Sequence, residues 1–455
     1  MENGQKINPT DKNNPKTICA WTFYDWANSV YSLVITATIF PIYYSLLTTD
    51  SKEVYNSKNI LVSESVRSQI FLFGRHYEAD SLFTYSLTLS FIIIVLTTPV
   101  LSSIADTLGA KKKFLKFFCY LGALSCMGLF FFTDKSLIKY GLFLNITSSI
   151  GFWGSLVFYN SFLPDIATED HQDKVSARGY IMGYLGSIIL LIICTILIQT
   201  ASSENRTFYF RVCFLLTGLW WSGFAQISFA GLPKGEKNGT LKLSVVKDSF
   251  RTLKNIQIEL FKYKSLKYFL LSFFCFSIGI QTIFLTATLF GANELRLDSL
   301  ILILCILSIQ IIAIFGAYLC STLAKIIGNK WVLIGCIITW TIICSFGFIL
   351  DKADPNVNYY FYVACGLVGL VMGGIQSISR STYSKMLPPK DAKATATYFS
   401  FYDVMEKCAI IVGTFAYGYL NQRTGNMRYS ILAMSIAFIF SLFFILFVNA
   451  KRING

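Results

Sequence analysis

The chain has 455 residues, of which 54% are hydrophobic and only 14% are charged. Soluble globular proteins carry about a quarter charged residues, and the apolar residues here form runs of roughly 18 or more, each long enough to cross a bilayer as a helix. The net charge of +14 fits the Lys and Arg of membrane-protein loops, and because no RNA-binding signature accompanies it, the composition excludes a soluble globular protein and nucleic acid is not an expected partner.

Twelve apolar runs predict an all-α membrane protein, because only a helix satisfies its own backbone hydrogen bonds inside lipid. A polar tail, residues 1–18, precedes them and lacks the apolar stretch of a cleaved signal peptide. The approximate bounds of the runs are 19–47, 82–105, 114–132, 139–163, 178–200, 209–231, 268–291, 298–321, 331–350, 358–383, 395–420 and 429–449.

The runs fall into two groups of six, which we expect to form two bundles. The first group occupies residues 19–231 and the second residues 268–455. Lys and Arg predominate in the loops that are internal when both termini are cytoplasmic, and this bias predicts that orientation.

The first run opens with FYDWANS, which places Asp25 about six residues, or roughly 9 Å, inside the helix. A carboxylate within the membrane is costly and normally faces a cavity or a partner. One interpretation is an ion pair with Arg178 or Arg380, and the other is a role in binding solute or protons. Both place Asp25 at the inner mouth between the bundles. Tyr24 and Asn28 are candidate cavity residues, although Tyr24 also suits an interfacial aromatic belt.

Two connections are longer than the rest. The outer loop 48–81 contains VRSQIFLFGRHYEAD, which suggests a small hairpin of unassigned function. The basic linker 232–267 alternates apolar and basic residues at helical spacing. This pattern predicts an amphipathic helix on the inner membrane surface, with membrane lipid headgroups as its partner.

The eleventh run carries three charges, Asp403, Glu406 and Lys407, roughly 12–18 Å from its inner end. Asp403 and Lys407 are four residues apart and can pair on one helix face, whereas Glu406 and Lys407 are adjacent and are not expected to face each other. Glu406 would then lack a local partner and become a proton carrier. The alternative is a structural triad that closes onto another helix. All three residues are candidates for proton coupling, which makes protons a candidate partner beside the solute.

The two groups of runs also share an internal repeat. The matched residues are Ser102 and Ser321, Gly109 and Gly328, and Lys111 and Lys330, each pair 219 residues apart. Leu163-Pro164 matches Leu387-Pro388 at an offset of 224 residues. Repeats of this kind build the two halves of many transporters, with the solute path between them.

Several stretches carry a resemblance to a known family. SSIADTLGAKKK resembles the loop 2–3 signature of the major facilitator superfamily, although Ser102 replaces its first glycine. FYDWANSVYSLVITATIFPIYY, VFYNSFLPDIA and GGIQSISRSTYSKMLPP are similar to the family of the fungal vacuolar amino-acid effluxer, which has many bacterial members. The resemblance spans all twelve runs and implies two pseudo-symmetric six-helix bundles. It implies a vacuolar-type membrane in a fungal host and the inner cell membrane in a bacterial one.

The same resemblance implies that loop 2–3 holds the cytoplasmic side shut. Asp106 ends the second helix, where its carboxylate can face the N-terminus of the eleventh helix near Thr395 or Thr397. The alternative is a solvated charge paired with Lys111 or Lys112. The other residues of this expected gate are Gly109, Lys111, Lys112, Arg178 and Arg380.

By analogy with the superfamily, helices one, four, seven and ten line a central cavity. Further candidate cavity residues on these helices are Tyr159, Asn160, Gln281 and Gln376. Arg178 or Arg380 could bind a carboxylate or phosphate through two hydrogen bonds. Both lie near the cytoplasmic end, however, where a gating role is expected.

The sequence therefore predicts a secondary active or facilitative transporter that moves a small polar solute by rocking of its two bundles. Amino-acid efflux is the first candidate, and no GxxxxGK[ST] motif for ATP is present. The alternatives are an intramembrane lipid-modifying enzyme using Asp403 and Glu406, and a non-transporting membrane receptor. The twelve cysteines lie mostly inside apolar runs, and His76 and His171 are the two histidines. We accordingly expect no enzyme, no cofactor and no metal site.

Overall fold

The computed structural model describes most of the chain. The described residues are 12–55, 61–67, 69–72, 74–202, 204–235, 249–290, 295, 299–350, 354–387, 395–424 and 427–449. The first half of the predicted linker, at 236–248, lies outside them.

The first membrane-crossing segment is a helix in three parts, α1 (Pro15–Val30), η2 (Tyr31–Ile39) and α2 (Phe40–Leu47). The middle part is π-helical, and the N–H of Phe40 donates to the carbonyl of Ile35, five residues back. Pro41 follows at once and has no N–H to donate. The wider turns therefore precede the position where a regular α-helical ladder would be interrupted.

The start of α1 changes the depth of Asp25. Pro15 occupies the first turn, and the side chain of Asn14 accepts a hydrogen bond from the N–H of Lys16. Both features favour a helix start here rather than at residue 19. Asp25 is ten residues from this start, which places it about 15 Å along the helix instead of roughly 9 Å.

The N-terminal bundle contains six membrane-crossing segments, and a long loop joins the first of them to the second. After the first segment they are α3 (Ala79–Leu108), α4 with η3 (Lys111–Gly128 and Leu129–Phe131), α5 (Ile138–Ser161), α7 (Glu169–Gln199) and α8 (Arg206–Gly231). The single turns η4 (Lys135–Leu137) and α6 (Leu163–Ile166) flank α5.

The C-terminal bundle contains the other six. They are α11 (Lys264–Leu289), α12 (Ser299–Ile327), α13 (Asn329–Ile349), α14 (Val357–Met386), α15 (Thr395–Thr424) and α16 (Met427–Leu446). Eleven of the twelve segments in the described part of the chain are long and apolar enough to cross a membrane. The exception is α15, whose apolar sequence is interrupted by Asp403, Glu406 and Lys407.

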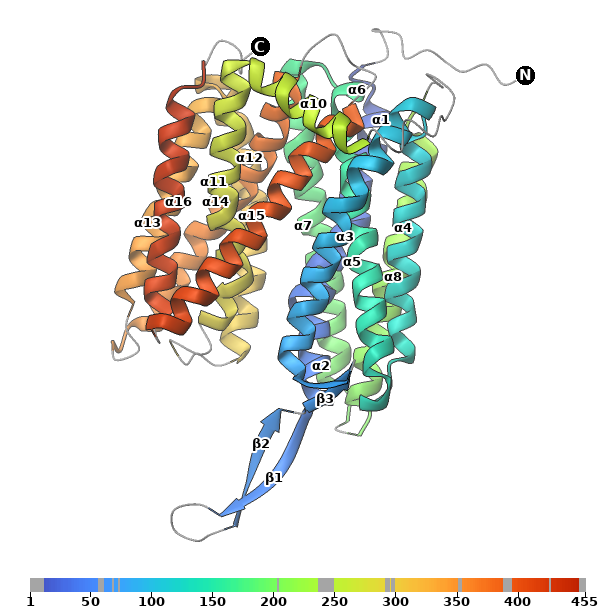
Figure 1. The fold of residues 1–455 in the computed structure, drawn as a ribbon, viewed down its shortest axis with the longest axis vertical. Helices are drawn as coiled ribbons and strands as arrows, with labels where there is room; N and C mark the ends of the chain where they lie inside the picture. Colours follow the sequence, from blue (N-terminus) through green and yellow to red (C-terminus); the bar gives the residue numbers. More distant parts are fainter. Residues whose placement is uncertain are drawn as a thin grey trace, which may run out of the picture.

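The two ends of the molecule differ. At one end, two antiparallel hairpins project from the first loop, β1 (Thr49–Tyr55) with β2 (Leu61–Arg67), and β3 (Gln69–Leu72) with β4 (Arg75–Glu78) (Figure 1). The second is the hairpin expected from VRSQIFLFGRHYEAD. We call this the hairpin end.

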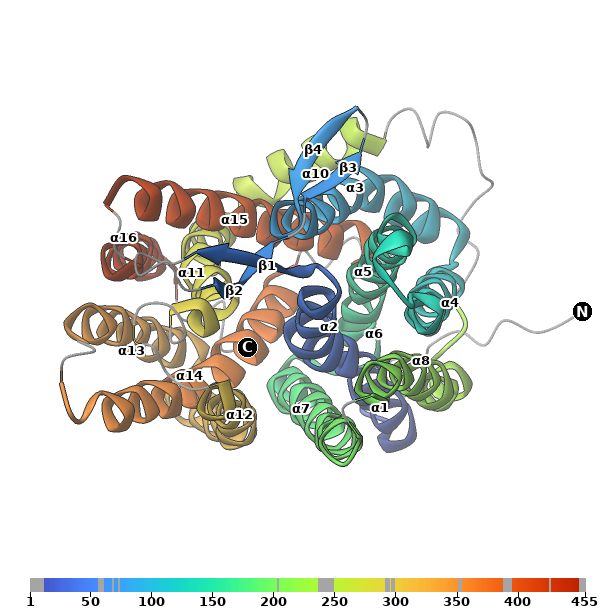
Figure 2. The same ribbon diagram turned by 90° about the horizontal axis from the view of Figure 1, so that it is seen from below.

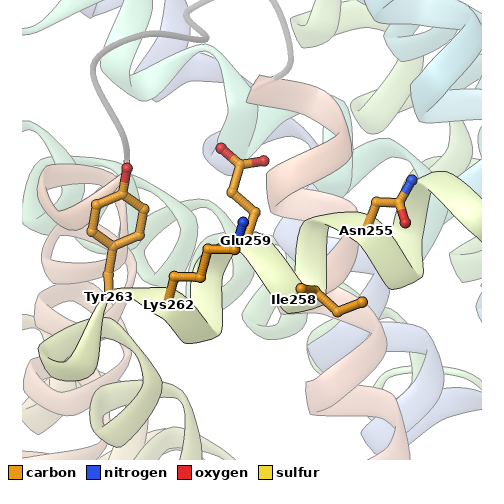
Figure 3. A pocket seen from close by; sticks show the side chains of 5 residues that line it. All are labelled: Asn255, Ile258, Glu259, Lys262 and Tyr263. Carbon is orange, nitrogen blue, oxygen red and sulfur yellow. The ribbon is translucent and has the colours of Figure 1, made fainter.

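At the opposite end, α10 (Ser249–Lys262) lies across the bundles (Figure 1). This is the amphipathic helix predicted in the linker, with Ile256 and Leu260 buried on its inner side. A surface pocket of about 620 Å³ is lined by four residues of α10, Asn255, Ile258, Glu259 and Lys262, and by Tyr263, which follows α10 (Figure 3). We call this the α10 end.

Each bundle has a core of its own. In the N-terminal bundle Trp21 and Trp221 are fully buried, and in the C-terminal bundle Trp340 stacks on Phe438 with ring centroids 5.8 Å apart. Viewed from the hairpin end, the bundles lie side by side with α3 and α7 facing α15, α14 and α12 (Figure 2). Two separate cores joined at a seam are the arrangement that permits the halves to move as units.

The repeated glycines occupy equivalent turns. Gly109 lies between α3 and α4 with φ +60°, and Gly328 lies between α12 and α13 with φ +85°. Side chains with a Cβ rarely adopt this left-handed conformation. The turn geometry thus explains why glycine stands at both places in the repeat.

Candidate functional site

Asp106, at the end of α3, closes over the N-terminus of α15. Its Oδ2 accepts hydrogen bonds from the N–H of Thr397 at 2.8 Å and from the Thr397 hydroxyl at 2.7 Å, and its Oδ1 accepts one from the N–H of Ala396 at 3.2 Å. The first N–H groups of a helix have no partner within the helix, and the helix dipole favours an anion there. Because Asp106 is buried and the two helices belong to different bundles, this contact has the geometry of a latch rather than of a solvated charge.

The lysines of the same loop have other partners. The Nζ of Lys111 forms an ion pair with Asp165 at 2.9 Å and also contacts the hydroxyl of Thr395 on α15. The Nζ of Lys112 donates to the carbonyl of Leu232, within its own bundle, at 2.6 Å. Lys111 therefore supports the contact between bundles, whereas Lys112 braces the N-terminal bundle.

A second contact joins the bundles at the α10 end. Near the start of α7, Asp173 accepts a hydrogen bond from the Asn329 amide at 2.8 Å and forms an ion pair with Lys385 at 2.6 Å. Asn329 also donates to Thr382 at 2.9 Å. Since Asp173 and Lys385 are both buried, this network fastens α7 to α13 and α14.

Asp173, Lys385 and Asn329 were not among the predicted site residues. The internal repeat nevertheless points to two of them, Asp173 and Asn329. An offset of 224 residues places Asp173 at the position of Thr397, and an offset of 219 places Asn329 at the position of Ala110. Both latches thus join a helix N-terminus of one bundle to the glycine turn of the other. Applying the repeat to Thr397 would have identified Asp173.

Deeper in the seam, Arg380 of α14 is inserted into the N-terminal bundle. Its Nε and Nη2 donate to the hydroxyl and carbonyl of Ser176 at 2.8 and 2.7 Å, and its Nη1 lies 3.2 Å from Asn160 Oδ1 and 3.4 Å from Asp25 Oδ2. Asp25 also accepts a hydrogen bond from the Tyr159 hydroxyl at 2.7 Å. Only 3% of Arg380 is exposed. Because its guanidinium is hydrogen-bonded to the opposite bundle, it is not available to a solute in this state.

Aromatic rings complete the surroundings of Arg380. Its Cζ lies 4.2 Å from the ring centroid of Tyr180, 4.9 Å from Trp21 and 5.6 Å from Tyr159. Such rings stabilise a cation that has lost its water. Tyr159 was a predicted site residue, whereas Tyr180 and Trp21 were not. Their positions in the sequence do not indicate that they pack against Arg380.

Arg178, the other predicted partner of Asp25, lies elsewhere. It is exposed on α7, and Ser176 and Tyr180, which face Arg380, are two residues to either side of it. At 3.6 residues per turn, residue 178 points to the opposite side of the helix. The pairing of Asp25 is therefore with Arg380 and not with Arg178.

The charges of α15 form a connected triad near mid-membrane. Lys407 Nζ lies 2.9 Å from Asp403 Oδ1 and 2.9 Å from Glu406 Oε2. The prediction that Glu406 has no local partner is therefore wrong. The side chains of adjacent residues leave a helix in different directions. The lysine side chain is nevertheless long enough to reach both carboxylates.

Two residues on other helices complete the triad's surroundings. Gln281 of α11 donates to Glu406 Oε1 at 2.9 Å, and the ring centroid of Trp153, on α5 of the opposite bundle, lies 3.6 Å from Lys407 Nζ. Gln281 was a predicted cavity residue, whereas Trp153 was not selected. The triad thus meets the other bundle at the seam and does not face lipid.

The remaining predicted cavity residues divide into two groups. Tyr24 and Asn28 are fully buried, and Tyr24 packs against Tyr159 and Phe229 inside the N-terminal bundle. The position of Tyr24 does not support a cavity role. Gln376 is only partly buried and accepts a hydrogen bond from Tyr184, across the seam, at 3.2 Å.

The polar groups form one strip along the seam. Tyr180 lies close enough to both Arg380 and Glu406 for their charges to act on its hydroxyl, and Tyr402 does the same from α15. Toward the hairpin end the described contact between bundles is apolar, through Ile306 and Leu307 of α12. In the same direction the ribbons of α3 and α15 diverge (Figure 1). The latches, then, lie toward the α10 end.

The described residues contain no group of three or more His, Cys, Asp or Glu side chains that could hold a metal ion. The charged and polar groups of this site form ion pairs and hydrogen bonds. Such groups can bind a polar solute or a proton, and can hold two bundles together.

The chain is similar to one family over nearly its whole length. The model of that family, described as "Vacuole effluxer Atg22 like", matches residues 13–454. The uncharacterized MFS-type transporter YxiO of Bacillus subtilis is 28% identical over 435 residues, covering 94% of each chain. Autophagy-related protein 22 of Vanderwaltozyma polyspora is 26% identical over 494 residues, covering 94% of this chain and 92% of that one.

Solved structures share the fold. The proton:xylose symporter XylE superposes with a TM-score of 0.70 at 12% identity, over 96% of each chain. FucP, an MFS transporter solved in the outward conformation, superposes with a TM-score of 0.66 at 12% identity, over 96% of this chain and 99% of that one. The architecture is therefore the major facilitator fold of two six-helix bundles.

Proposed function

Because the chain belongs to the Atg22-like family of major facilitator superfamily transporters, we propose that it exports small polar solutes, with amino acids as the substrate class, by rocking of its two bundles. Its relatives and structural neighbours are transporters and not enzymes. The comparisons thus favour neither the lipid-modifying enzyme nor the non-transporting receptor.

One observation carries the proposal, namely that buried ionic groups meet across the seam between the bundles. Arg380 of α14 is held by Asp25 of α1, and Lys385 of α14 by Asp173 of α7. Buried charges within a membrane protein are costly and mark solute or ion pathways, or the switches that control them. Ion pairs that form and break at the seam between two moving bundles are consistent with alternating access.

The basic linker and the loops near α10 carry the excess of Lys and Arg, so we place the α10 end in the cytoplasm. The latches formed by Asp106 and Asp173 then close the cytoplasmic side in this state. Their release would open the solute path to the cytoplasm, where solute would enter in export across a cell membrane and leave in efflux from a vacuole.

The strip between Arg380 and Glu406 is the proposed solute path. Asn160, Gln281 and Gln376 are partly buried along it and can donate or accept hydrogen bonds. A zwitterion suits a path with both signs of charge, since Arg380 can bind a carboxylate once the gate opens. Asp403, Glu406 and Lys407 are the proposed proton-coupling residues.

Transport by the purified protein tests this proposal. Proteoliposomes loaded with one unlabelled amino acid should accumulate the same labelled amino acid by counterflow, and the rate should respond to a pH gradient. The full set of amino acids, with sugars and nucleosides as comparison solutes, would be screened. Counterflow of sugars or nucleosides but of no amino acid would contradict the substrate class, and binding without counterflow would contradict transport.

A further inference from the structure

The charges on α15 do not balance, and we propose that the triad is a binding site for a primary ammonium group of the solute, which exchanges there with a proton. This inference rests on the proposed transport of amino acids. It identifies the ammonium group as the part of the solute that is recognised. It also states that the solute and a proton cannot occupy the site at the same time.

Counting charges gives the first argument. Asp403 and Glu406 carry two negative charges and Lys407 one positive charge, so the triad has an uncompensated negative charge. The side chain of Lys407 is fully buried and that of Asp403 is 7% exposed. An excess charge in such a place is costly until a cation neutralises it.

No neighbouring group supplies that cation. Gln281 on α11 and Trp153 on α5 are neutral, and Tyr402 on α15 and Tyr180 on α7 are phenols. Arg380 is engaged by Asp25 and Ser176. Among the described residues, then, the negative charge of the triad has no fixed counterion beyond Lys407.

The surroundings of Lys407 show that the groups of this site bind an ammonium. Its ammonium lies between two carboxylate oxygens at 2.9 Å and over the face of an indole at 3.6 Å. Carboxylates and an aromatic face are the partners that desolvated ammonium groups prefer. A second ammonium would meet the same kinds of group.

The site also has a free acceptor and an approach to it. Asp403 Oδ2 is buried and has no hydrogen-bond partner among the described residues. The Glu406 side chain is 21% exposed, so a ligand can reach the triad from that side. An ammonium has three donors, enough to engage Glu406 and extend to Asp403 Oδ2 while Lys407 keeps its place.

A single monovalent cation matches the missing charge. A divalent metal ion is disfavoured, because the described residues offer no cluster of three or more ligating acids, histidines or cysteines. A proton or one ammonium group neutralises the triad, and both together would leave it positive. Solute and proton therefore occupy the site alternately, which makes the protein an exchanger of one for the other.

Competition in proteoliposomes tests the ammonium part. Against counterflow of a transported amino acid, the decarboxylated primary amine should compete, whereas the 2-hydroxy acid of the same skeleton should not. Replacing choline with sodium in the buffer should have no effect. Equal competition by the hydroxy acid, or inhibition by sodium, would overturn the ammonium site while leaving amino-acid transport in place.

Substitutions test the exchange. Glu406→Gln should raise the half-saturating amino-acid concentration at least tenfold and abolish the effect of a pH gradient, while Glu406→Asp should retain that effect. Glu259→Gln is the matched control, because Glu259 lines the surface pocket on α10 and lies on a different helix from the triad (Figure 3). An unchanged gradient response in folded Glu406→Gln would overturn the exchange. Absence of amino-acid counterflow in the wild-type protein would instead defeat the proposed function, and the ammonium site with it.

Discussion

At the scale of single residues, Arg380 joins the two bundles through several contacts. Its guanidinium donates to Ser176, Asn160 and Asp25, all on the opposite bundle, and is surrounded by aromatic rings. Removing one partner of a buried ion pair costs about 3–5 kcal/mol, since the other charge is left unpaired, whereas removing both can be nearly neutral. A gate built this way responds steeply to the loss of either charge.

Because removing one partner of a buried ion pair costs more than removing both, we expect a strong coupling between Asp25 and Arg380. Asp25→Asn and Arg380→Gln should each reduce counterflow about tenfold or more, and the loss in the double variant should be smaller than the product of the two single losses, with a coupling energy of about 1–3 kcal/mol. Arg178→Gln should transport normally, because Arg178 is exposed and lies away from the pair. Initial rates, normalised to folded protein in the liposomes, measure the cycle. Additive losses in the double variant would contradict the coupling.

Sequence alone could indicate that Asp25 needs a partner but not which one. The cost of a carboxylate in a membrane is a local property and can be inferred from position in the chain. The choice between Arg178 and Arg380 depends on which face of α7 packs against α1 and α14, and that is set by long-range packing. The same limit explains why Trp153 was missed beside Lys407.

At the scale of elements, the latches are helix N-termini joined to the turn of the opposite bundle. α15 begins where Asp106 accepts the N–H groups of Ala396 and Thr397, and Asp173 lies in the first turns of α7, where it receives Asn329. The helix caps and the closed gate are therefore the same contacts. Opening the gate must expose the amides of the α15 N-terminus to water.

Hydrogen–deuterium exchange can detect this link. Asp106→Asn removes the negative charge that the dipole of α15 favours, which is worth up to about 2 kcal/mol in a partly buried geometry, so amides at Ala396 and Thr397 should exchange several-fold faster than in the wild-type protein. Asp134→Asn is the control, because Asp134 caps the exposed turn η4 and touches no residue of the other bundle in its described contacts. Exchange at α15 that is unchanged by Asp106→Asn would show that the latch does not hold this end.

The elements themselves were largely predictable. Apolar runs of about five or more turns between charged loops can only be helices in lipid, and the twelve segments match the predictions closely. The amphipathic α10 and the β3–β4 hairpin match as well. The start of α1 and the π-helical η2 were not foreseen. Both depend on local features, the Asn14 cap and Pro41, that the length of an apolar run does not reveal.

At the scale of the whole molecule, two bundles with separate cores meet at a seam of polar and charged groups. The internal repeat predicted the two bundles and, through its glycines, their equivalent turns. It also relates Asp173 to Thr397, but it could not predict that the latch carboxylate lies before the glycine turn in one half, as Asp106, and at the helix N-terminus in the other, as Asp173, because the latch residues themselves have diverged. In the proposed transport cycle the two ends of this seam open alternately.

Distances across both ends of the seam test that claim most directly. Spin labels would be introduced through a keto amino acid, since the chain has twelve cysteines. One pair, at Lys174 of α7 and Lys325 of α12, reports the α10 end. The other, at Thr200 beyond α7 and Asn356 before α14, reports the hairpin end, and all four positions are exposed.

The perturbation is the variant Asp106→Asn combined with Arg380→Gln, which removes two closing contacts without requiring a known solute. Pulsed electron–electron double resonance should show the Lys174–Lys325 distances lengthening and the Thr200–Asn356 distances shortening, as the bundles rock about their middle. A longer distance at the α10 end with no change at the hairpin end, or no change at either, would contradict alternating access by these contacts.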